Sequence, residues 1–373
     1  MRTRLALLPI ALLLVAATPL PPQPAGVPWP TTRWAEGPLL AAVDRPALEA
    51  AAAALFAPLG RGGAPDTRAL LAVQGGRVVW ERFADGFGAD SRFRSWSMAK
   101  SVTNALVAIL VRDGQLALDG PAPVPRWQHE GDPRRALTLR QLLHMTSGLD
   151  NEDGDDGGDS FIARLLFGDL ASDTAKGAER VELAYEPGTH WAYSTGTSQI
   201  LSGIVARTVG GGRGGVRTFL ERELIGPLGL RTLVLEFDPA ETPLGGGYVW
   251  ASAEDWARLG LLYLRDGIWD GRRILPEGWV DFTRTVAPAE NNGTYGAHFW
   301  ISAKPAEGQF QTLRPGIEAF QMNGNAGQFV VIVPDRDLVV VRLGEMHAST
   351  WRQLNDQLGA LIQAFPQRDT APR

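Results

Sequence analysis

The sequence predicts a mixed α/β (α+β) fold in which an antiparallel sheet is flanked by helices. Hydrophobic segments with strand patterns lie near both ends of the 373-residue chain, at 69–84 and 328–344. Segments with helical spacing lie between and beside them. Hairpins at both ends with helices between them favour one sheet built from both halves of the chain, with a helical insertion at about 96–229.

The N-terminal half supplies three of these elements. Residues 45–60 are rich in alanine and predict a helix that ends near Pro58. Residues 69–84 alternate around two glycines and predict a β-hairpin. From Ser97 the apolar residues recur with a period of 3.6, which predicts a helix that ends at Gly114.

The remaining elements follow in chain order. Four segments have helical patterns, at 138–149, 193–211, 254–267 and 350–365. Between the last two, residues 328–344 form two apolar, β-branched runs joined by a Pro-Asp-Arg-Asp turn. This pattern predicts a second hairpin with both strands largely buried.

Composition limits the function. The formal net charge of −5 and the pI near 5.7 give no reason to expect nucleic acid or an anionic membrane as a partner. Cysteine is absent, which excludes disulfides, thiol nucleophiles and thiolate metal sites. The acidic run at 150–159 lacks the spacing of an EF-hand and is interpreted as a solvated loop. We therefore expect no metal and no cofactor.

The N-terminus has the features of an export signal. Two arginines precede an apolar run at 5–20, and a proline-rich stretch follows it. The run has about 16 residues, short of a bilayer span. We expect a signal peptide and leader at 1–25 and an exported, periplasmic domain at 26–373. The α/β part of this domain is expected at about 30–95 and 230–373. An uncleaved membrane anchor is the alternative.

The segment Ser97-Met98-Ala99-Lys100 is a candidate catalytic motif. Lysine occurs only three times in the chain, whereas arginine supplies the other basic residues. S-x-x-K is expected about 0.1 times by chance in this composition. Residues three apart share a helix face, so the Ser97 hydroxyl and the Lys100 amine can meet. Free N–H groups of the first turn favour developing negative charge at Ser97. In the alternative interpretation, Ser97 only caps the helix and Lys100 faces solvent.

A serine nucleophile needs a base, and histidine offers no recognisable motif in this chain. No serine lies in a G-x-S-x-G elbow, and no H-E-x-x-H pair is present. Lysine is then the better candidate base. Lys100 would have to lose a proton that in water leaves near pH 10.4, which requires burial or a second cation.

Several segments together resemble a known family. SMAK resembles the S-x-x-K motif of serine β-lactamases and penicillin-binding proteins. The segments 142–149, 186–205, 246–279 and 324–341 resemble class C β-lactamase-related hydrolases, and most of all the 6-aminohexanoate-dimer hydrolase and esterase branch. The likeness runs from about residue 28 to 365. It implies a β-lactamase/transpeptidase-like fold and a serine hydrolase that forms an acyl-enzyme.

The resemblance also implies roles for residues outside SMAK. Tyr193 matches the tyrosine of the family's Y-x-N motif, which passes protons as a phenolate or a hydrogen-bond relay. The third family element, K-T-G or H-x-G on a strand edge, matches Asn325-Ala326-Gly327 in the substrate-binding region. The backbone N–H of Gln328 is expected to form the oxyanion hole with that of Ser97.

Two departures from the family pattern bear on the substrate. Thr195 replaces the Asn of Y-x-N, and Asn325 stands where a cation usually holds the substrate carboxylate. We therefore expect poor β-lactamase activity and better turnover of small esters or linear amides. The alternatives are a β-lactamase or D-Ala-D-Ala carboxypeptidase, and a catalytically silent binding protein on the same scaffold. Trp191, Trp250 and Trp300 are candidates for either the pocket wall or the core. The sequence indicates no oligomeric state.

Overall fold

The structure is a computed structural model that describes residues 19–58, 66–154, 160–302, 313 and 316–368. Most of the predicted leader therefore lies outside the described residues, as does the second half of the acidic run. None of the helices in the described ranges combines the length and apolar character needed to cross a bilayer.

One seven-stranded sheet unites the two ends of the chain. Its order is β1-β3-β2-β12-β11-β10-β9. The strands are β1 (Ala35–Glu36), β2 (Thr67–Gln74), β3 (Arg77–Phe83), β9 (Trp300–Ile301), β10 (Phe320–Gly324), β11 (Gln328–Val333) and β12 (Leu338–Gly344). All neighbours are antiparallel except the short β1–β3 pair. The predicted mixed fold and both predicted hairpins are confirmed.

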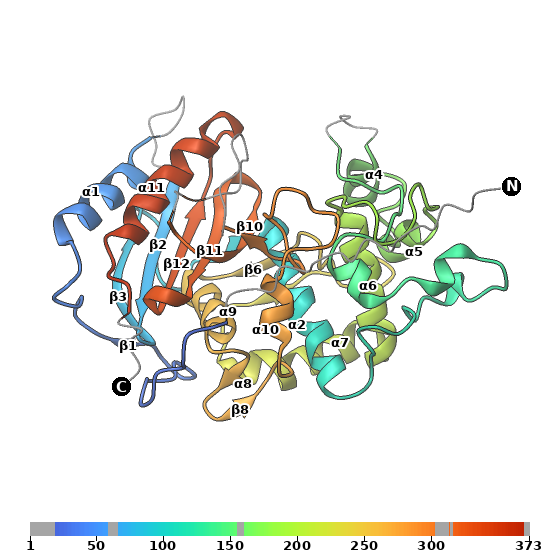
Figure 1. The fold of residues 1–373 in the computed structure, drawn as a ribbon, viewed down its shortest axis with the longest axis horizontal. Helices are drawn as coiled ribbons and strands as arrows, with labels where there is room; N and C mark the ends of the chain where they lie inside the picture. The colour runs from blue at the N-terminus through green and yellow to red at the C-terminus, as the bar shows by residue number, and fades with distance from the viewer. Residues whose placement is uncertain (1–18, 59–65, 155–159, 303–312, 314–315, 369–373) are drawn as a thin grey trace, which may run out of the picture.

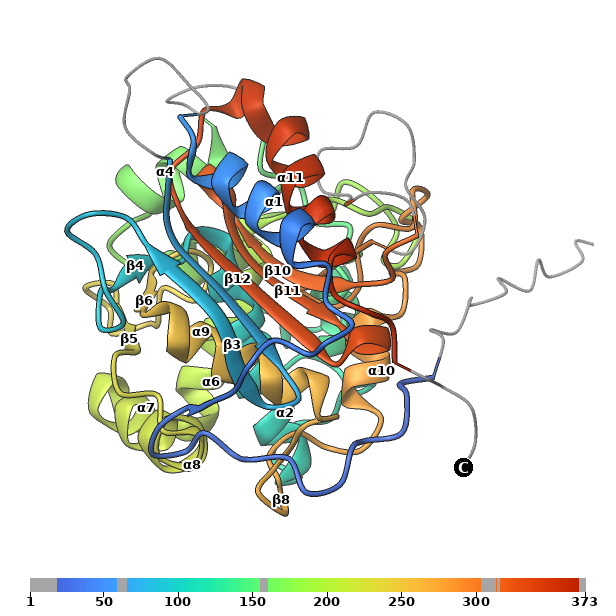
Figure 2. The same ribbon diagram turned by 90° about the vertical axis from the view of Figure 1, so that its left-hand side faces the viewer.

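The two faces of this sheet are covered by different helices. Helices α1 (Arg45–Phe56) and α11 (Trp351–Gln363) lie side by side on one face (Figure 2). Side chains of a strand alternate between faces, so in β2 Leu70 packs under these helices while Leu71 packs toward the opposite side. Both faces are thus buried, which explains the continuous apolar runs of the central strands.

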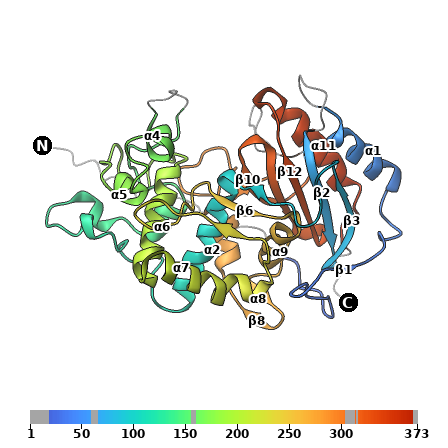
Figure 3. The same cartoon turned by 180° about the vertical axis from the view of Figure 1, so that it is seen from behind.

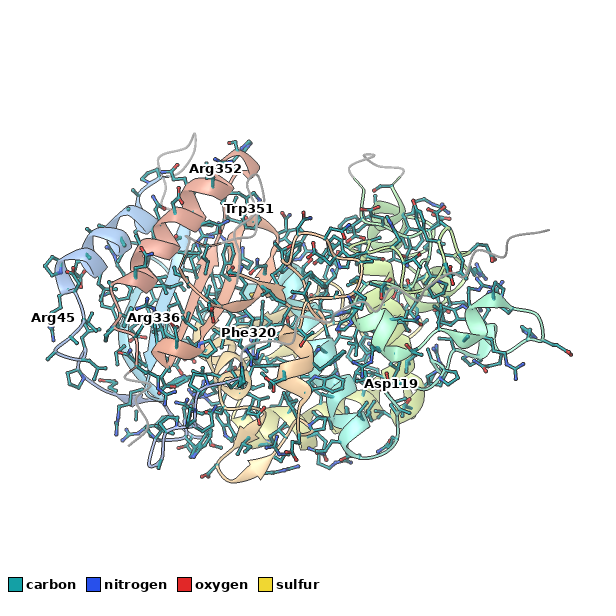
Figure 4. All side chains as sticks on the ribbon, in the orientation of Figure 1. Arg45, Asp119, Phe320, Arg336, Trp351 and Arg352 are labelled. Carbon is teal, nitrogen blue, oxygen red and sulfur yellow. The ribbon has the colours of Figure 1, made fainter. Side chains whose placement is uncertain are left out.

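The opposite face packs on α9 (Ala253–Leu264), and beyond it lie the remaining helices (Figures 1 and 3). In Figure 4, Trp351 lies on the sheet side of the molecule and Asp119 among the helices of the other part. These other helices include α2 (Ala99–Arg112), α3 (Leu139–Leu143), α4 (Phe161–Phe167), α5 (Thr174–Glu179), α6 (Thr195–Val209), α7 (Gly212–Leu220), α8 (Gly226–Leu228) and α10 (Trp279–Arg284). The additional strands form two small sheets, β4 (Phe93–Arg94) with β6 (Val249–Ala251) and β5 (Val234–Leu235), and β7 (Ile268–Trp269) with β8 (Arg272–Arg273).

Local sequence signals set the ends of these elements. The Asp44 side chain accepts a hydrogen bond from Ala47 N at 3.0 Å and begins α1. That helix ends at Phe56, earlier than predicted, because the residue before Pro58 takes an extended conformation. Similarly, α6 begins at Thr195 behind a Ser194 cap, so Tyr193 precedes the helix instead of opening it.

Candidate active site

Ser97 lies between β4 and α2, in a 3-10 turn that spans Trp96–Met98. Two hydrogen bonds join Ser95, the residue before this turn, to β6. Ser95 N donates to Val249 O at 2.7 Å, and Val249 N donates to Ser95 Oγ at 3.1 Å. Trp96 adopts a φ of 47°, which is a strained conformation for an aromatic residue. Strain of this kind persists only where the surroundings hold it, and here it precedes the predicted nucleophile.

Lys100 is buried beside Ser97, with 1% of its surface exposed. Its Nζ lies 3.2 Å from Ser97 Oγ, 2.9 Å from Thr195 Oγ1 and 3.0 Å from Gly246 O. Burial lowers the pKa of Lys100 to about 8, because the ammonium loses its hydration. The interpretation of Lys100 as a solvent-facing residue is therefore wrong.

Tyr193 completes the group. Its phenol hydrogen-bonds the Ser97 side chain, and its ring centroid lies 4.9 Å from Lys100 Nζ. Burial raises the pKa of Tyr193 above its ordinary value of 10.0, so the hydroxyl keeps its proton. Of the two roles expected for this tyrosine, the geometry favours the hydrogen-bond relay. The structure thus brings the three predicted catalytic side chains together.

Aromatic side chains surround Tyr193. Its ring lies 5.7 Å from that of Tyr295 and 5.4 Å from that of Trp300, and Trp191 packs against both of these residues. We call Trp191, Tyr295 and Trp300 the aromatic wall. Trp250 lies elsewhere, on β6, where its Nε1 donates to Glu236.

The end of β10 lies against the backbone that leads to Ser97. A Cβ atom at Gly324 would stand 2.1 Å from Ser95 O, so only glycine fits. The next residues form the turn that holds the predicted third element: Asn325 is exposed, while Gly327 is buried with a φ of 80°. Ala326, between them, has a φ of 57°. The third element therefore lies beside the nucleophile segment, as expected.

Gln328 begins β11 directly after this turn and pairs with Gly324 of β10. Its side chain contacts the end of β12, since Gly344 N donates to Gln328 Oε1 at 3.1 Å. The backbone of β10 is the part of the turn that approaches Ser95. The oxyanion role of the Gln328 N–H stays a prediction.

Asp153 is a site residue that the sequence did not single out. Its carboxylate accepts from Thr195 N at 2.8 Å and from Thr195 Oγ1 at 2.5 Å. In the sequence it stands within the acidic run, where nothing distinguishes it from its solvated neighbours. The interpretation of this run as a solvated loop is therefore wrong at Asp153, while residues 155–159 lie outside the described ranges.

Histidine supplies no alternative base here. His298 is buried, and its two ring nitrogens contact Ser198 Oγ at 2.9 Å and Leu143 O at 2.8 Å. Burial lowers its pKa to about 3, so the ring is neutral. Among the residues that the structure describes, no group of three or more His, Asp or Glu side chains is placed to hold a metal ion.

Comparisons with known proteins identify the class of protein. The family model described as Beta-lactamase matches residues 52–345, more than half of the chain. The chain therefore belongs to the β-lactamase family, and the resemblance found in its motifs is confirmed.

Three relatives match parts of the chain. The chain is 27% identical over 291 residues to the 6-aminohexanoate-dimer hydrolase of Paenarthrobacter ureafaciens, covering 74% of this chain and 72% of the relative. It is 34% identical over 137 residues to Esterase EstB of Burkholderia gladioli, covering 32% and 33%. Protein Rv1367c of Mycobacterium tuberculosis is 25% identical over 315 residues, covering 68% and 77%.

Solved structures agree on the fold. A Bacillus anthracis protein provisionally described as a 6-aminohexanoate-dimer hydrolase superposes with a TM-score of 0.68 at 19% identity, covering 91% of each chain. A penicillin-binding protein homologue from Caulobacter crescentus gives a TM-score of 0.62 at 18% identity, covering 87% of this chain and 99% of that one. The chain thus has a β-lactamase/transpeptidase-like fold.

Proposed function

We propose that this protein is a serine hydrolase that cleaves small ester or linear amide bonds through an acyl-enzyme. One observation carries the proposal: a buried lysine amine lies 3.2 Å from the Ser97 hydroxyl, and a phenol hydrogen-bonds the same hydroxyl. With its pKa lowered to about 8, the amine can lose its proton near neutral pH and act as a base.

The first half of the reaction forms the acyl-enzyme. Neutral Lys100 accepts the Ser97 hydroxyl proton while Oγ forms a bond to the substrate carbonyl carbon. The N–H of Ser97 and that of Gln328, at the start of β11, stabilise the oxyanion. The bond to the leaving group then breaks, and the proton passes from Lys100 through the Tyr193 hydroxyl to the leaving oxygen or nitrogen.

The second half releases the acid. Water attacks the acyl carbon, and its proton passes through Tyr193 to Lys100. The bond to Ser97 Oγ breaks, and Oγ recovers a proton from Lys100. Lysine and tyrosine are regenerated, so each turnover consumes one water.

Two residues support esters and linear amides over β-lactams. Thr195 offers a hydroxyl where an amide would hold the amide of a β-lactam, and the exposed Asn325 has no charge with which to grip a carboxylate. The names of two relatives, a 6-aminohexanoate-dimer hydrolase and an esterase, agree with this preference. The aromatic wall beside Tyr193 would suit apolar acyl groups.

The protein is further proposed to act outside the cytoplasm. The support is the basic and apolar character of residues 1–20. N-terminal sequencing of exported material would give a start near residue 26, whereas an intact Met1 in a membrane fraction would favour the uncleaved anchor.

The test combines activity with intact-mass detection. Ser97→Ala is expected to abolish p-nitrophenyl ester hydrolysis and the mass adduct left by a fluorophosphonate, whereas Ser172→Ala, at an exposed serine, retains both. Full activity in Ser97→Ala would refute the nucleophile. Nitrocefin turnover close to that of esters would favour the β-lactamase alternative, and a wild-type protein that takes no label would favour a silent binding protein.

A further inference from the structure

We propose that Asp153 is a positioning residue that fixes the Thr195 hydroxyl and thereby aims the lone pair of Lys100 at Ser97. The inference rests on the proposed function, because it concerns the base of that reaction. It assigns a role to an acidic residue that acts on the base through the Thr195 hydroxyl, which it holds by hydrogen bonds.

The first step concerns the Thr195 hydroxyl, which has one proton to donate. A carboxylate only accepts hydrogen bonds. Asp153 Oδ2 lies 2.5 Å from Thr195 Oγ1, and Asp153 Oδ1 accepts from Thr195 N at 2.8 Å, so the carboxylate holds both donors of this residue. The hydroxyl proton is thus committed to Asp153, and Thr195 Oγ1 presents only lone pairs to Lys100.

The second step concerns the protons of Lys100. A neutral amine has two N–H groups and one lone pair. Thr195 Oγ1 at 2.9 Å and Gly246 O at 3.0 Å both accept, so each takes one N–H. The remaining direction, toward Ser97 Oγ at 3.2 Å, is left for the lone pair. This is the arrangement that a base needs to remove the serine proton.

The third step concerns the fixed position of Asp153 itself. Its backbone N–H donates to Tyr193 O at 2.9 Å, and next to it Ser194 Oγ donates to Asn151 O at 2.7 Å. The segment that carries Asp153 is therefore bonded to the backbone of the relay tyrosine on one side and to the α6 cap on the other. A shift of Asp153 would disturb Thr195 and Tyr193 together.

The arrangement also explains how threonine can occupy the third position of the Y-x-N pattern. An asparagine there offers an amide oxygen to the lysine and keeps N–H donors for a substrate. Thr195 offers an acceptor only while Asp153 takes its proton, and then no donor is left for a substrate amide. The Asp153–Thr195 pair thus orients the base without assisting β-lactam binding.

The titratable groups near this pair set the expected pH effect. Asp153, Tyr193, His298 and Lys100 interact across the site, and Tyr295 lies within reach of Asp153. Burial keeps the two phenols and the imidazole neutral. Burial also raises the pKa of Asp153, against the Lys100 charge and the two Thr195 hydrogen bonds, which lower it, and the Glu152 charge raises it further. The Asp153 charge raises the pKa of Lys100 against the larger opposing effect of burial. Removal of that charge therefore lowers the pKa of Lys100.

The key variant is Asp153→Asn. Its amide N–H donates to Thr195 Oγ1 and turns the threonine proton toward Lys100, where it competes for the lone pair. The plateau of kcat for a p-nitrophenyl ester is expected to fall about 30-fold, within the range of a misplaced general base. The acidic limb of the kcat/KM profile is expected to move to lower pH, because Lys100 loses its proton more readily.

Three further variants isolate the mechanism. Thr195→Val should lower the plateau similarly, Thr195→Ser should retain most of the rate, and the Asp153→Asn/Thr195→Val pair should cost no more than either single change. Glu152→Gln is the matched control, since it removes an exposed charge next door without touching Thr195. It should leave the kcat plateau and the acidic limb of the kcat/KM profile unchanged.

Several outcomes would overturn the inference: a wild-type plateau in Asp153→Asn, an unmoved acidic limb, additive losses in the double variant, or an equal effect of Glu152→Gln. Rates are referred to the protein that takes the fluorophosphonate label, so a partly unfolded sample cannot imitate a slower base. An inactive Ser97→Ala beside a fully active Asp153→Asn would refute this inference alone. An active Ser97→Ala would refute the proposed function itself.

Discussion

Lys100 and Arg342 are both buried cations, and each contacts a hydroxyl oxygen. Arg342 is fully buried on β12 and donates to Thr67 Oγ1 at 3.0 Å, Gly327 O at 2.8 Å and Glu345 O at 2.8 Å. Burial lowers the pKa of Arg342 to about 9, so the guanidinium is still charged at neutral pH.

The Lys100 side chain differs, because burial lowers its pKa to about 8 and an ammonium loses its proton more readily than a guanidinium. The hydroxyl beside it, Ser97, is the proposed nucleophile, whereas the Thr67 hydroxyl beside Arg342 has no role in the proposed reaction. The comparison indicates that a buried cation can act as a base only when its pKa falls within reach of the working pH.

The largest expected effect is on ester hydrolysis, when Lys100 is replaced by a cation that does not lose its proton. Lys100→Arg keeps the charge but supplies a group that stays protonated, so ester hydrolysis should fall at least about 1,000-fold. Lys176→Arg, at an exposed lysine, is the control and should retain the wild-type rate. Steady-state kinetics with a p-nitrophenyl ester measures both, and substantial activity in Lys100→Arg would remove Lys100 from the mechanism.

The next largest expected effect is a loss of unfolding free energy when Arg342 is replaced. Arg342→Met leaves buried carbonyls at the turn after β10 and at the end of β12 without donors, which should cost about 3 kcal/mol of unfolding free energy. The loss should be the same at pH 5.5 and pH 7, since both values lie below the pKa of about 9 that burial leaves to Arg342. Denaturant unfolding at both pH values measures it. A loss that changes between these two pH values would mean that Arg342 titrates within this range.

The smallest expected effect is an increase in the free energy of unfolding, when Lys100 is replaced by an apolar residue. The pKa of Lys100 is about 8 in the folded chain and 10.5 ordinarily, so between these values the unfolded chain binds more protons and stability rises with pH. At pH 7 this burial costs up to about 3 kcal/mol. Lys100→Met removes that cost but loses three hydrogen bonds, so it should stabilise the fold by about 1 kcal/mol at pH 7.

That gain should disappear by pH 10.5, where the folded wild-type chain no longer holds its proton at a cost. Denaturant unfolding of both proteins across this range gives the difference, with Lys176→Met as the exposed control. A gain that is independent of pH would show that packing of methionine, and not the titration of Lys100, accounts for it.

The fold could be predicted because the spacing of apolar residues, which distinguishes strands from helices, can be read within a short segment of sequence. The hairpins of β2–β3 and β11–β12 could be read from alternation and turn residues, and both ends of the chain did join one sheet. The meeting of Ser97 and Lys100 was equally predictable, since a spacing of three places two side chains on one helix face.

The rest of the site depends on contacts between distant segments. Tyr193 was identified only through its family motif, and Gly246 contributes a carbonyl oxygen, which no residue type reveals. Asp153 could not be told apart from the other acidic residues of the run 150–159, because only its contact with Thr195 distinguishes it. The oxyanion role of Gln328 stays a prediction for a similar reason: a family motif identifies the turn, whereas strand pairing decides which of its amides faces the substrate.

Gly324 has a consequence for how the surroundings of Ser97 can vary. The backbone that leads to the nucleophile approaches β10 so closely that a single methyl group at residue 324 would collide with the Ser95 carbonyl oxygen. No side chain can be accommodated between these two segments. A substitution at residue 324 would therefore push them apart, and the segment that carries Ser97 would have to move.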